Sequence, residues 1–131
     1  MSAPDLALKR ILCVDNNADS CDLLITMLSD YEVIPTGTVS EGLRLARSDR
    51  FDLVILEQRL PDGQGTDLCR LIHDFMPRTP ILFFSCAAYA ADRRDGLAAG
   101  AQEYLVKPDD LATLEPNITR LIRHSEAGGV G

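Results

Sequence analysis

Three short runs of uninterrupted apolar residues constrain the fold of this chain more than any other feature. They lie at residues 11–14, 53–56 and 81–84. A strand with one solvated face alternates apolar and polar residues, whereas a strand covered on both faces is apolar throughout. The runs therefore predict central strands of a parallel sheet that has helices on both faces.

Two more extended segments, at residues 31–36 and 103–106, raise the predicted number of strands to five. Helical spacing separates the strands, with apolar residues at i, i+3, i+4 and i+7. The residues with this spacing are Cys21, Leu24, Ile25 and Leu28, then Leu68, Leu71, Ile72 and Phe75. Strands that alternate with helices through short loops predict right-handed βαβ units. We therefore expect an α/β fold, a single doubly wound (βα)5 flavodoxin-like domain with strand order 2-1-3-4-5. Pro35 lacks a ladder donor, which suits an edge position for the second strand.

The helix boundaries follow from capping residues and from proline and glycine. Ser40 is the expected N-cap of the second helix, with Glu41 in its first turn. The fourth helix, at about residues 91–99, contains Gly96 and is expected to be short and mobile. Proline inside a helix costs roughly 3 kcal/mol. We therefore expect Thr113 to cap the fifth helix, so that Pro116 falls early in it.

A chain of 131 residues fits one domain, expected at residues 9–124, with an extension at 1–8 and a flexible tail or linker at 125–131. No apolar run reaches the roughly 18–20 residues of a membrane span, and the first residues lack a signal sequence. The net charge of −7 argues against nucleic acid as a partner. The cysteines show no CxxC spacing, which favours reduced core thiols in the cytoplasm. They are Cys13, Cys21, Cys69 and Cys86.

Polar residues follow four of the predicted strands. Asp15 and Asn16 follow the first, Glu57 the third, Ser85 the fourth and Lys107 the fifth. In an open parallel sheet the carboxyl ends of the strands form the binding crevice. Any one of these residues could simply cap the next helix. Together they supply carboxylate, amide, hydroxyl and ammonium groups, which suit a phosphoryl group or its metal ion.

With these residues in place, the sequence resembles the response regulator receiver family of two-component phosphorelays over about residues 9–124. The motifs that carry the resemblance are Ile-Leu-Cys-Val-Asp at 11–15, Phe-Asp-Leu-Val-Ile-Leu-Glu at 51–57, Leu-Pro-Asp-Gly-Gln-Gly at 60–65, Ser85, and Gly-Ala-Gln-Glu-Tyr-Leu-Val-Lys-Pro at 100–108. The last of these is the most specific.

The resemblance implies a role for each strand-end residue. Glu57 occupies the phosphoacceptor position, where the family has aspartate. The family's Mg2+ ligands correspond to Asp15, Asn16, Glu57 and the main-chain carbonyl of Arg59.

The resemblance also implies a switch. Ser85 matches the hydroxyl residue that holds the phosphoryl group, and Tyr104 matches the aromatic residue that repositions with it. Lys107 matches the lysine that pairs with a phosphoryl oxygen, and its peptide bond to Pro108 is expected to be cis.

Two departures from the family pattern lie in this one crevice. Asn16 removes a negative charge from the metal site, so Mg2+ binding is expected to be weak. Glu57 is one methylene longer than aspartate, which moves its carboxylate about 1–1.5 Å further into the pocket. Phosphoryl transfer depends on positioning, and a displacement of about 1 Å costs on the order of a hundredfold. The longer carboxylate could instead pair with Lys107 and accept a hydrogen bond from Ser85.

These departures leave several functions open. The domain is either a degenerate receiver in which Glu57 mimics the phosphorylated state, or an inert one in which Glu57 only neutralises Lys107. The alternatives are a phosphorylation-independent docking module and a Mg2+-dependent receiver that is still phosphorylated. No enzymatic activity is expected, because the first strand is not followed by the GxGxxG, FMN-phosphate or DxD motifs of related folds.

The remaining expectations concern partners and surfaces. A histidine kinase or other signalling protein is the expected partner. A homodimer would form through the fourth helix, fifth strand and fifth helix, where the charged residues are Arg93, Arg94, Asp95, Arg120 and Arg123. Arg59 is expected to be a solvated loop residue, and Cys86 a small buried one. His73 and His124 have no partners at metal-ligand spacing and are expected to be surface residues.

Overall fold

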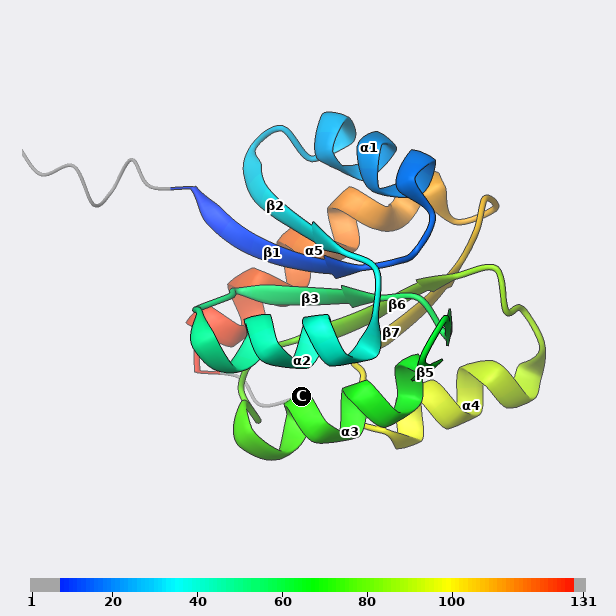
Figure 1. Ribbon diagram of the computed structural model, residues 1–131. Coiled ribbons are helices and arrows are strands. Elements are labelled where there is room, and N and C mark those ends of the chain that lie inside the picture. Colours follow the sequence, from blue (N-terminus) through cyan, green and yellow to red (C-terminus); the bar gives the residue numbers. More distant parts are fainter. Residues whose placement is uncertain (1–7, 129–131) are drawn as a thin grey trace, which may run out of the picture.

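One parallel sheet of five strands forms the centre of the molecule, in the order β2-β1-β3-β6-β7. The computed structural model describes residues 8–128. The strands are β1 (Lys9–Val14), β2 (Tyr31–Thr36), β3 (Leu53–Leu56), β6 (Ile81–Ser85) and β7 (Glu103–Val106). All five predicted strands and their predicted order are confirmed (Figure 1). β2 pairs with β1 alone, so Pro35 lies on an edge strand as expected.

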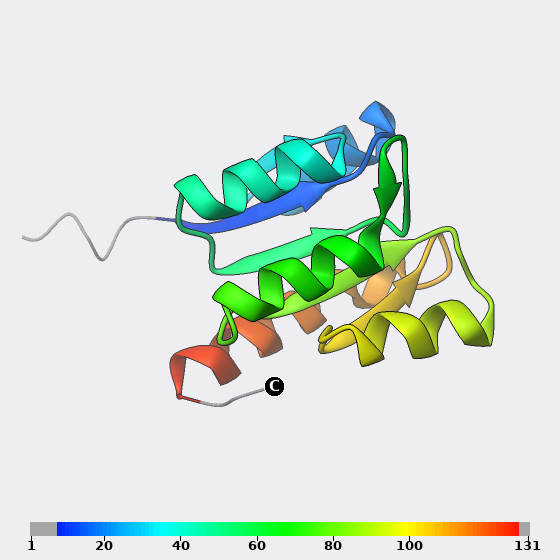
Figure 2. The ribbon, with the colours of Figure 1, turned by 60° about the horizontal axis from the view of Figure 1, so that its bottom comes forward.

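Helices cover both faces of the sheet (Figures 1 and 2). They are α1 (Ala18–Met27), α2 (Val39–Ser48), α3 (Gly65–Phe75), α4 (Ala90–Ala98) and α5 (Leu111–Glu126). Alternate residues of β1 enter different cores. Ile11 and Cys13 pack with α1 and α5, whereas Leu12 and Val14 pack with α2 and α3. The continuous apolar runs thus reflect burial on both faces.

The predicted apolar stripes of α1 and α3 are only partly correct. Ile25, Leu71 and Phe75 are each about 40% exposed, with values of 41, 41 and 39%. Cys69, outside the predicted stripe, is fully buried beside Leu68. The buried face of α3 is therefore rotated towards the i+1 position, because the helix packs on the sheet beside both α2 and α4.

The expected N-cap of α2 is also wrong. Thr38 caps the helix, and its hydroxyl accepts a hydrogen bond from the Glu41 amide at 3.1 Å. The carboxylate of Asp62 accepts from the amides of Val39 and Ser40, at 2.7 and 3.0 Å. Asp62 lies in a small hairpin that the sequence did not predict, formed by β4 (Arg59–Leu60) and β5 (Gly63–Gln64). This contact ties the loop after β3 to the start of α2.

α5 begins earlier than expected and contains Pro116 in its interior. Asp110 is the N-cap, so the prediction of Thr113 was wrong. The buried residues of the helix are Leu114, Ile118, Leu121 and Ile122. Burial of a side chain of this size is worth roughly 1.5–3 kcal/mol. Four of them outweigh the cost of one proline, roughly 3 kcal/mol.

α4 has nine residues, and its close packing on the sheet requires a glycine at position 96. A Cβ atom built on Gly96 would lie 2.7 Å from the Tyr104 ring and 3.2 Å from the Phe83 ring. The glycine therefore lets the helix approach the sheet closely. The prediction of a mobile helix treated Gly96 only as a poor helix former.

The two ends of the domain meet at the start of β1. Lys9 forms an ion pair with Glu126 at the end of α5. Residues 1–7 of the predicted extension and 129–131 of the predicted tail lie outside the described residues, whereas Ser125 and Glu126, also in the predicted tail, belong to α5.

Candidate functional site

A crevice of about 300 Å3 opens at the carboxyl ends of the central strands. It is lined by Asp15, Asn16, Asn17, Ser20, Glu57, Arg59, Cys86, Ala87 and Lys107. All the predicted metal-site residues are therefore in one place. Ser85 and Tyr104 are not among the lining residues; both are buried, at 0 and 1% exposed. Parallel strands deliver these residues to one edge because each strand ends beside its neighbours.

Glu57 is the central acceptor of this site and is 7% exposed. One carboxylate oxygen, Oε2, accepts hydrogen bonds from the Ser85 hydroxyl and from the Gln58 amide, the latter at 2.6 Å. The other, Oε1, accepts from Lys107 Nζ at 3.1 Å and from the Cys86 amide at 3.4 Å. Both oxygens of the carboxylate thus have protein donors.

Lys107 bridges the two carboxylates of the site. Its ammonium donates to Asp15 Oδ2, to Glu57 Oε1 and to the Ser20 hydroxyl, the last at 3.2 Å. Burial alone lowers the pKa of Lys107, but the hydrogen bonds and charges of Asp15 and Glu57 outweigh burial and raise it. Lys107 is therefore a cation at neutral pH. Its peptide bond to Pro108 is cis, as expected.

Both carboxylate oxygens of Asp15 also accept hydrogen bonds, Oδ2 from Lys107 and Oδ1 from the Asn17 amide at 2.9 Å. Asn17 in turn caps α1 by accepting from the Ser20 amide at 2.9 Å. Ser20 was missed by the sequence analysis. Ser20 is the third residue of α1, and its hydroxyl accepts a hydrogen bond from Lys107 in the crevice.

Backbone packing fixes the position of Glu57 from behind. A Cβ atom on Gly65 would lie 2.3 Å from the Glu57 carbonyl oxygen, so the start of α3 passes too close for any other residue. The Gln58 side chain, also missed by the sequence analysis, accepts from the Thr66 amide at 3.0 Å. The main-chain carbonyl of Gln58 accepts from the Gly65 amide at 2.7 Å. These contacts restrict the conformation of the backbone at Glu57 and Gln58.

A chain of hydrogen bonds leads from Glu57 to β7. Ser85 Oγ, which donates to Glu57, accepts from the Ala87 amide at 3.0 Å. The Ala87 carbonyl accepts from the Tyr104 hydroxyl at 2.6 Å. The Tyr104 ring stacks on Phe83 with centroids 5.1 Å apart, and its burial raises the pKa of the phenol. The predicted switch residues are therefore linked and inward-facing.

The charges of the crevice bear on its capacity for a metal ion. Asp15 and Glu57 contribute −2 and Lys107 contributes +1, so these three residues carry a net charge of −1. Asn16 adds none. Between residues 8 and 128 there is no group of three or more His, Cys, Asp and Glu residues arranged to hold a metal ion. Carboxylate and carbonyl oxygens do suit Mg2+; here the carboxylate oxygens are already paired.

Three further predictions concern Cys86 and Arg59 at the crevice and two histidines at the opposite end of the domain. Cys86 is exposed, so the prediction of a buried residue was wrong; its side chain lies at the mouth of the crevice, where β6 has ended. Arg59 is exposed, as expected, and also lines the crevice. His124 is exposed, as expected, whereas His73 is half-buried; both line one common cavity.

Known proteins are similar to this chain in sequence. The family model described as the response regulator receiver domain matches residues 11–119. PhoP, the alkaline phosphatase synthesis transcriptional regulatory protein of Bacillus subtilis, is 30% identical over 120 residues, which cover 90% of this chain and 50% of PhoP. NisR, the nisin biosynthesis regulatory protein of Lactococcus lactis, is 32% identical over 124 residues, 90% of this chain and 54% of NisR. The chain thus spans about half the length of these relatives.

Solved structures of receiver domains are also similar to this chain in sequence and fold. A CheY-like response regulator receiver domain protein from Methanospirillum hungatei is 30% identical with a TM-score of 0.84, covering 94% of this chain and 100% of that one. The non-phosphorylated HemR receiver domain from Leptospira biflexa is 36% identical with a TM-score of 0.79, covering 87 and 94%. In the part of the chain that the structure describes, no helix is long and apolar enough to cross a membrane.

Proposed function

Because this chain belongs to the response regulator receiver family, we propose that it is a receiver domain in which Glu57 replaces the phosphorylated acceptor and holds one signalling state. The proposal has two parts. The first is a role in two-component signalling, which the family match supports. The second is that the crevice works without phosphoryl transfer, and that part depends on the contacts of Glu57.

The observation that carries the proposal is the pair of donors on the Glu57 carboxylate. In the family, a hydroxyl and a lysine hold the phosphoryl oxygens. Here the hydroxyl of Ser85 and the ammonium of Lys107 both donate to Glu57. The longer side chain therefore provides, without modification, the negative oxygens that these donors otherwise find on phosphate.

The position of Tyr104 supports a fixed state. In the family, this aromatic residue moves together with the hydroxyl residue. With Ser85 held by Glu57, the Tyr104 hydroxyl is bonded to the Ala87 carbonyl and its ring is 1% exposed. Because the Glu57 carboxylate is always present to accept the hydrogen bond of Ser85, this arrangement stays populated without a phosphodonor.

Mg2+ fits the chemistry of the crevice but is not required by the proposal. Asp15, Asn16, Glu57 and the Arg59 carbonyl would hold it, and Mg2+ would supply neutralising charge to a phosphoryl group. To bind it, Glu57 and Asp15 must give up hydrogen bonds to Lys107, Ser85 and the loop amides. Weak binding follows from that competition and from the neutral Asn16.

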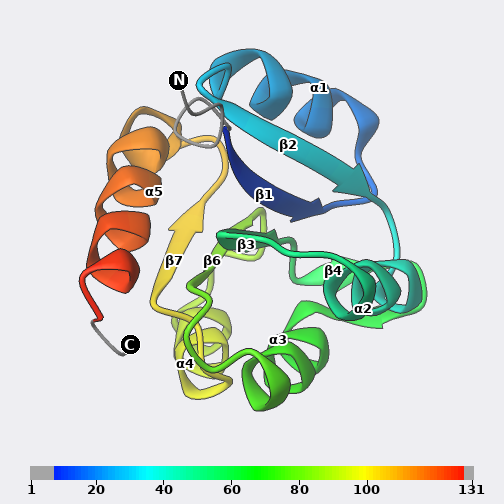
Figure 3. The same cartoon turned by 90° about the vertical axis from the view of Figure 1, so that its left-hand side faces the viewer.

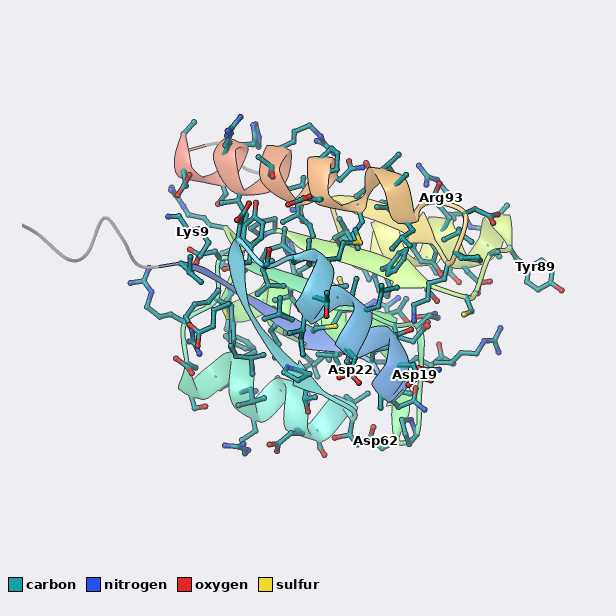
Figure 4. All side chains as sticks on the ribbon, turned by 90° about the horizontal axis from the view of Figure 1, so that it is seen from above. Lys9, Asp19, Asp22, Asp62, Tyr89 and Arg93 are labelled. Carbon is teal, nitrogen blue, oxygen red and sulfur yellow. The ribbon has the colours of Figure 1, made fainter. Side chains whose placement is uncertain are left out.

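The partners follow from this role. A histidine kinase or other cytoplasmic signalling protein would recognise the domain in its fixed state. A homodimer would use α4, β7 and α5. On that face Arg93 donates to the Tyr104 carbonyl at 2.9 Å, and Arg120 pairs with Glu103 at 3.3 Å. Among the described residues, Arg94 forms an ion pair only with Asp95, and its side chain is 74% exposed, so its charge is accessible to a partner. The exposed Tyr89 side chain projects from the start of α4 (Figure 4).

Incubation with acetyl phosphate and Mg2+, followed by intact mass measurement, tests the proposal. The wild-type domain should gain no phosphate. A variant with both Asn16→Asp and Glu57→Asp restores the usual acidic pair and acceptor, and it should gain one. Stoichiometric phosphorylation of the wild type at Glu57 would overturn the proposal in favour of a receiver that is still phosphorylated.

A further inference from the structure

A second cavity, of about 610 Å3, lies at the end of the domain opposite the crevice. It is lined by His73, Leu97, Gly100, Ala101, Gln102, Arg120, Leu121 and His124. These residues come from the ends of α3 and α4, the loop between α4 and β7, and the second half of α5. Figure 3 shows this end of the molecule, at which the strands begin. Small-molecule sites typically have volumes of about 300–1,000 Å3.

From its lining, we propose that this cavity binds a small organic anion, with a carboxylate or phosphate group on a compact apolar body. The polar lining consists of two imidazoles, one guanidinium and one carboxamide, and no carboxylate lines it. In a chain with a net charge of −7, such a set of donors is unusual. Leu97, Ala101 and Leu121 supply the apolar part.

Arg120 has donors to spare for an anion. Among the nitrogen atoms of its guanidinium, only Nη2 has described partners, Glu103 at 3.3 Å and Asn117 at 2.6 Å. These contacts hold the guanidinium at the edge of the cavity. A guanidinium has five N–H donors in a planar fork that matches a carboxylate or phosphate.

Gln102 is oriented by its own hydrogen bond. Its side-chain oxygen accepts from the Ile81 amide at 2.7 Å. The oxygen is therefore used within the protein, and the amide nitrogen is the part of the group left to donate. A donor fixed in this way adds to the preference for an anion.

The wall at His73 contains a polar atom that the described residues leave unsatisfied. His73 Nδ1 is buried without a hydrogen-bond partner. The ring packs on Gly100, where an added Cβ would lie 2.8 Å from it. Gly100 has φ of +117°, a conformation that favours glycine. A buried polar atom without a partner destabilises the protein, so a ligand that orders this wall and supplies a partner would remove that cost.

Stabilisation of the helix ends explains only in part why histidines occupy positions 73 and 124. His73 and His124 lie in the last turns of α3 and α5, where cationic side chains are favoured. That role requires no cavity between them. It also does not explain why Arg120 and Gln102 present donors to the same space.

Titration of the 15N-labelled domain with benzoate at constant ionic strength tests the site, with neutral benzamide as the matched probe. Benzoate should shift the amides of Gly100, Ala101 and Gln102 with saturation, and benzamide should bind at least tenfold more weakly. Arg120→Gln should weaken benzoate binding about tenfold, the equivalent of about 1.4 kcal/mol. His124→Gln should weaken it as well.

Arg123→Gln is the matched control, because Arg123 is exposed on the same helix and does not line the cavity. Its affinity for benzoate should equal that of the wild type. The proposal is overturned if the shifts do not saturate, if they are confined to the crevice, or if Arg120→Gln and Arg123→Gln bind alike. It is also overturned if benzamide binds as tightly as benzoate.

Discussion

Replacing Lys107 with methionine should destabilise the domain strongly at neutral pH and weakly in acid. Lys107 is the one cation that contacts both buried carboxylates among the described residues. Their side chains, those of Asp15 and Glu57, are only 5 and 8% exposed. Methionine preserves most of the shape of lysine but removes the charge, so the variant isolates the electrostatic contribution.

The magnitude follows from what remains after the substitution. Glu57 keeps the Ser85 hydroxyl and the Gln58 amide, and Asp15 keeps the Asn17 amide. Two adjacent carboxylates without a counterion are then buried together. Breaking a buried pair in this way costs about 3–5 kcal/mol. Domains have only about 5–15 kcal/mol of stability, so Lys107→Met should still fold, but marginally.

The pH dependence has a definite sign. Burial and a neighbouring like charge disfavour the two ionised carboxylates in the variant. Acid removes these negative charges, so the folded state of the variant loses stability as the pH rises. The deficit relative to wild type should therefore grow between about pH 4 and pH 7.

Urea denaturation followed by circular dichroism measures this deficit, because the chain has no tryptophan. Adding Glu57→Gln to Lys107→Met should restore at least half of the lost stability, since one of the two charges is then absent. A deficit below about 1 kcal/mol that does not change with pH would refute the reasoning, because a loosely solvated pair behaves in that way.

Four other results are expected. Gly96→Ala should cost about 1–3 kcal/mol in urea denaturation and shift the NMR signals of Tyr104, whose ring lies 2.7 Å from the added Cβ; unchanged stability would contradict the close packing. Pro116→Ala should stabilise α5 by up to about 3 kcal/mol, because it restores a helical hydrogen bond, and a loss of stability would show that the proline is favourable there. A thiol reagent should modify one cysteine, Cys86, in the native domain and four after unfolding; rapid reaction of more than one would contradict the burial of the others. The raised pKa of Lys107 gives the folded state stability that is lost as pH rises above the usual lysine value of 10.5, so the deficit of Lys107→Met should shrink at strongly alkaline pH.

Much of the fold could be predicted from local sequence patterns. The apolar runs at residues 11–14, 53–56 and 81–84 identified the buried strands, because burial on both faces leaves no polar position. Pro35 identified the edge strand, because its missing donor excludes a central one. The residues of the crevice followed, since they directly succeed these strands.

The errors occurred where long-range packing decides the local structure. The burial of α5 outweighs the cost of Pro116, and only the neighbouring sheet reveals this. Gly96 looked like a weak point because its contact, Tyr104, is distant along the chain. Thr38, not Ser40, caps α2, and Asp62 reaches that helix from a hairpin too short to show a pattern of its own.

The site itself shows the same division. The residue types at the strand ends could be predicted from the sequence, and so could the contacts of Glu57 with Lys107 and Ser85. The contact of Lys107 with Asp15 was not predicted. Ser20 and Gln58 enter the network through a helix cap and through a contact with α3. The link from Glu57 through Ser85 to Tyr104 depends on side-chain positions that no spacing specifies.

NMR comparison with a restored receiver tests most directly whether Glu57 fixes the switch. The reference is the Asn16→Asp, Glu57→Asp variant, recorded free and with Mg2+ and beryllofluoride, which imitates a phosphoryl group. The amide signals of Ala87 and Tyr104 in the unmodified wild type should match those of the beryllofluoride-bound variant. If they match those of the free variant instead, Glu57 only neutralises Lys107, and the account of a fixed signalling state is wrong.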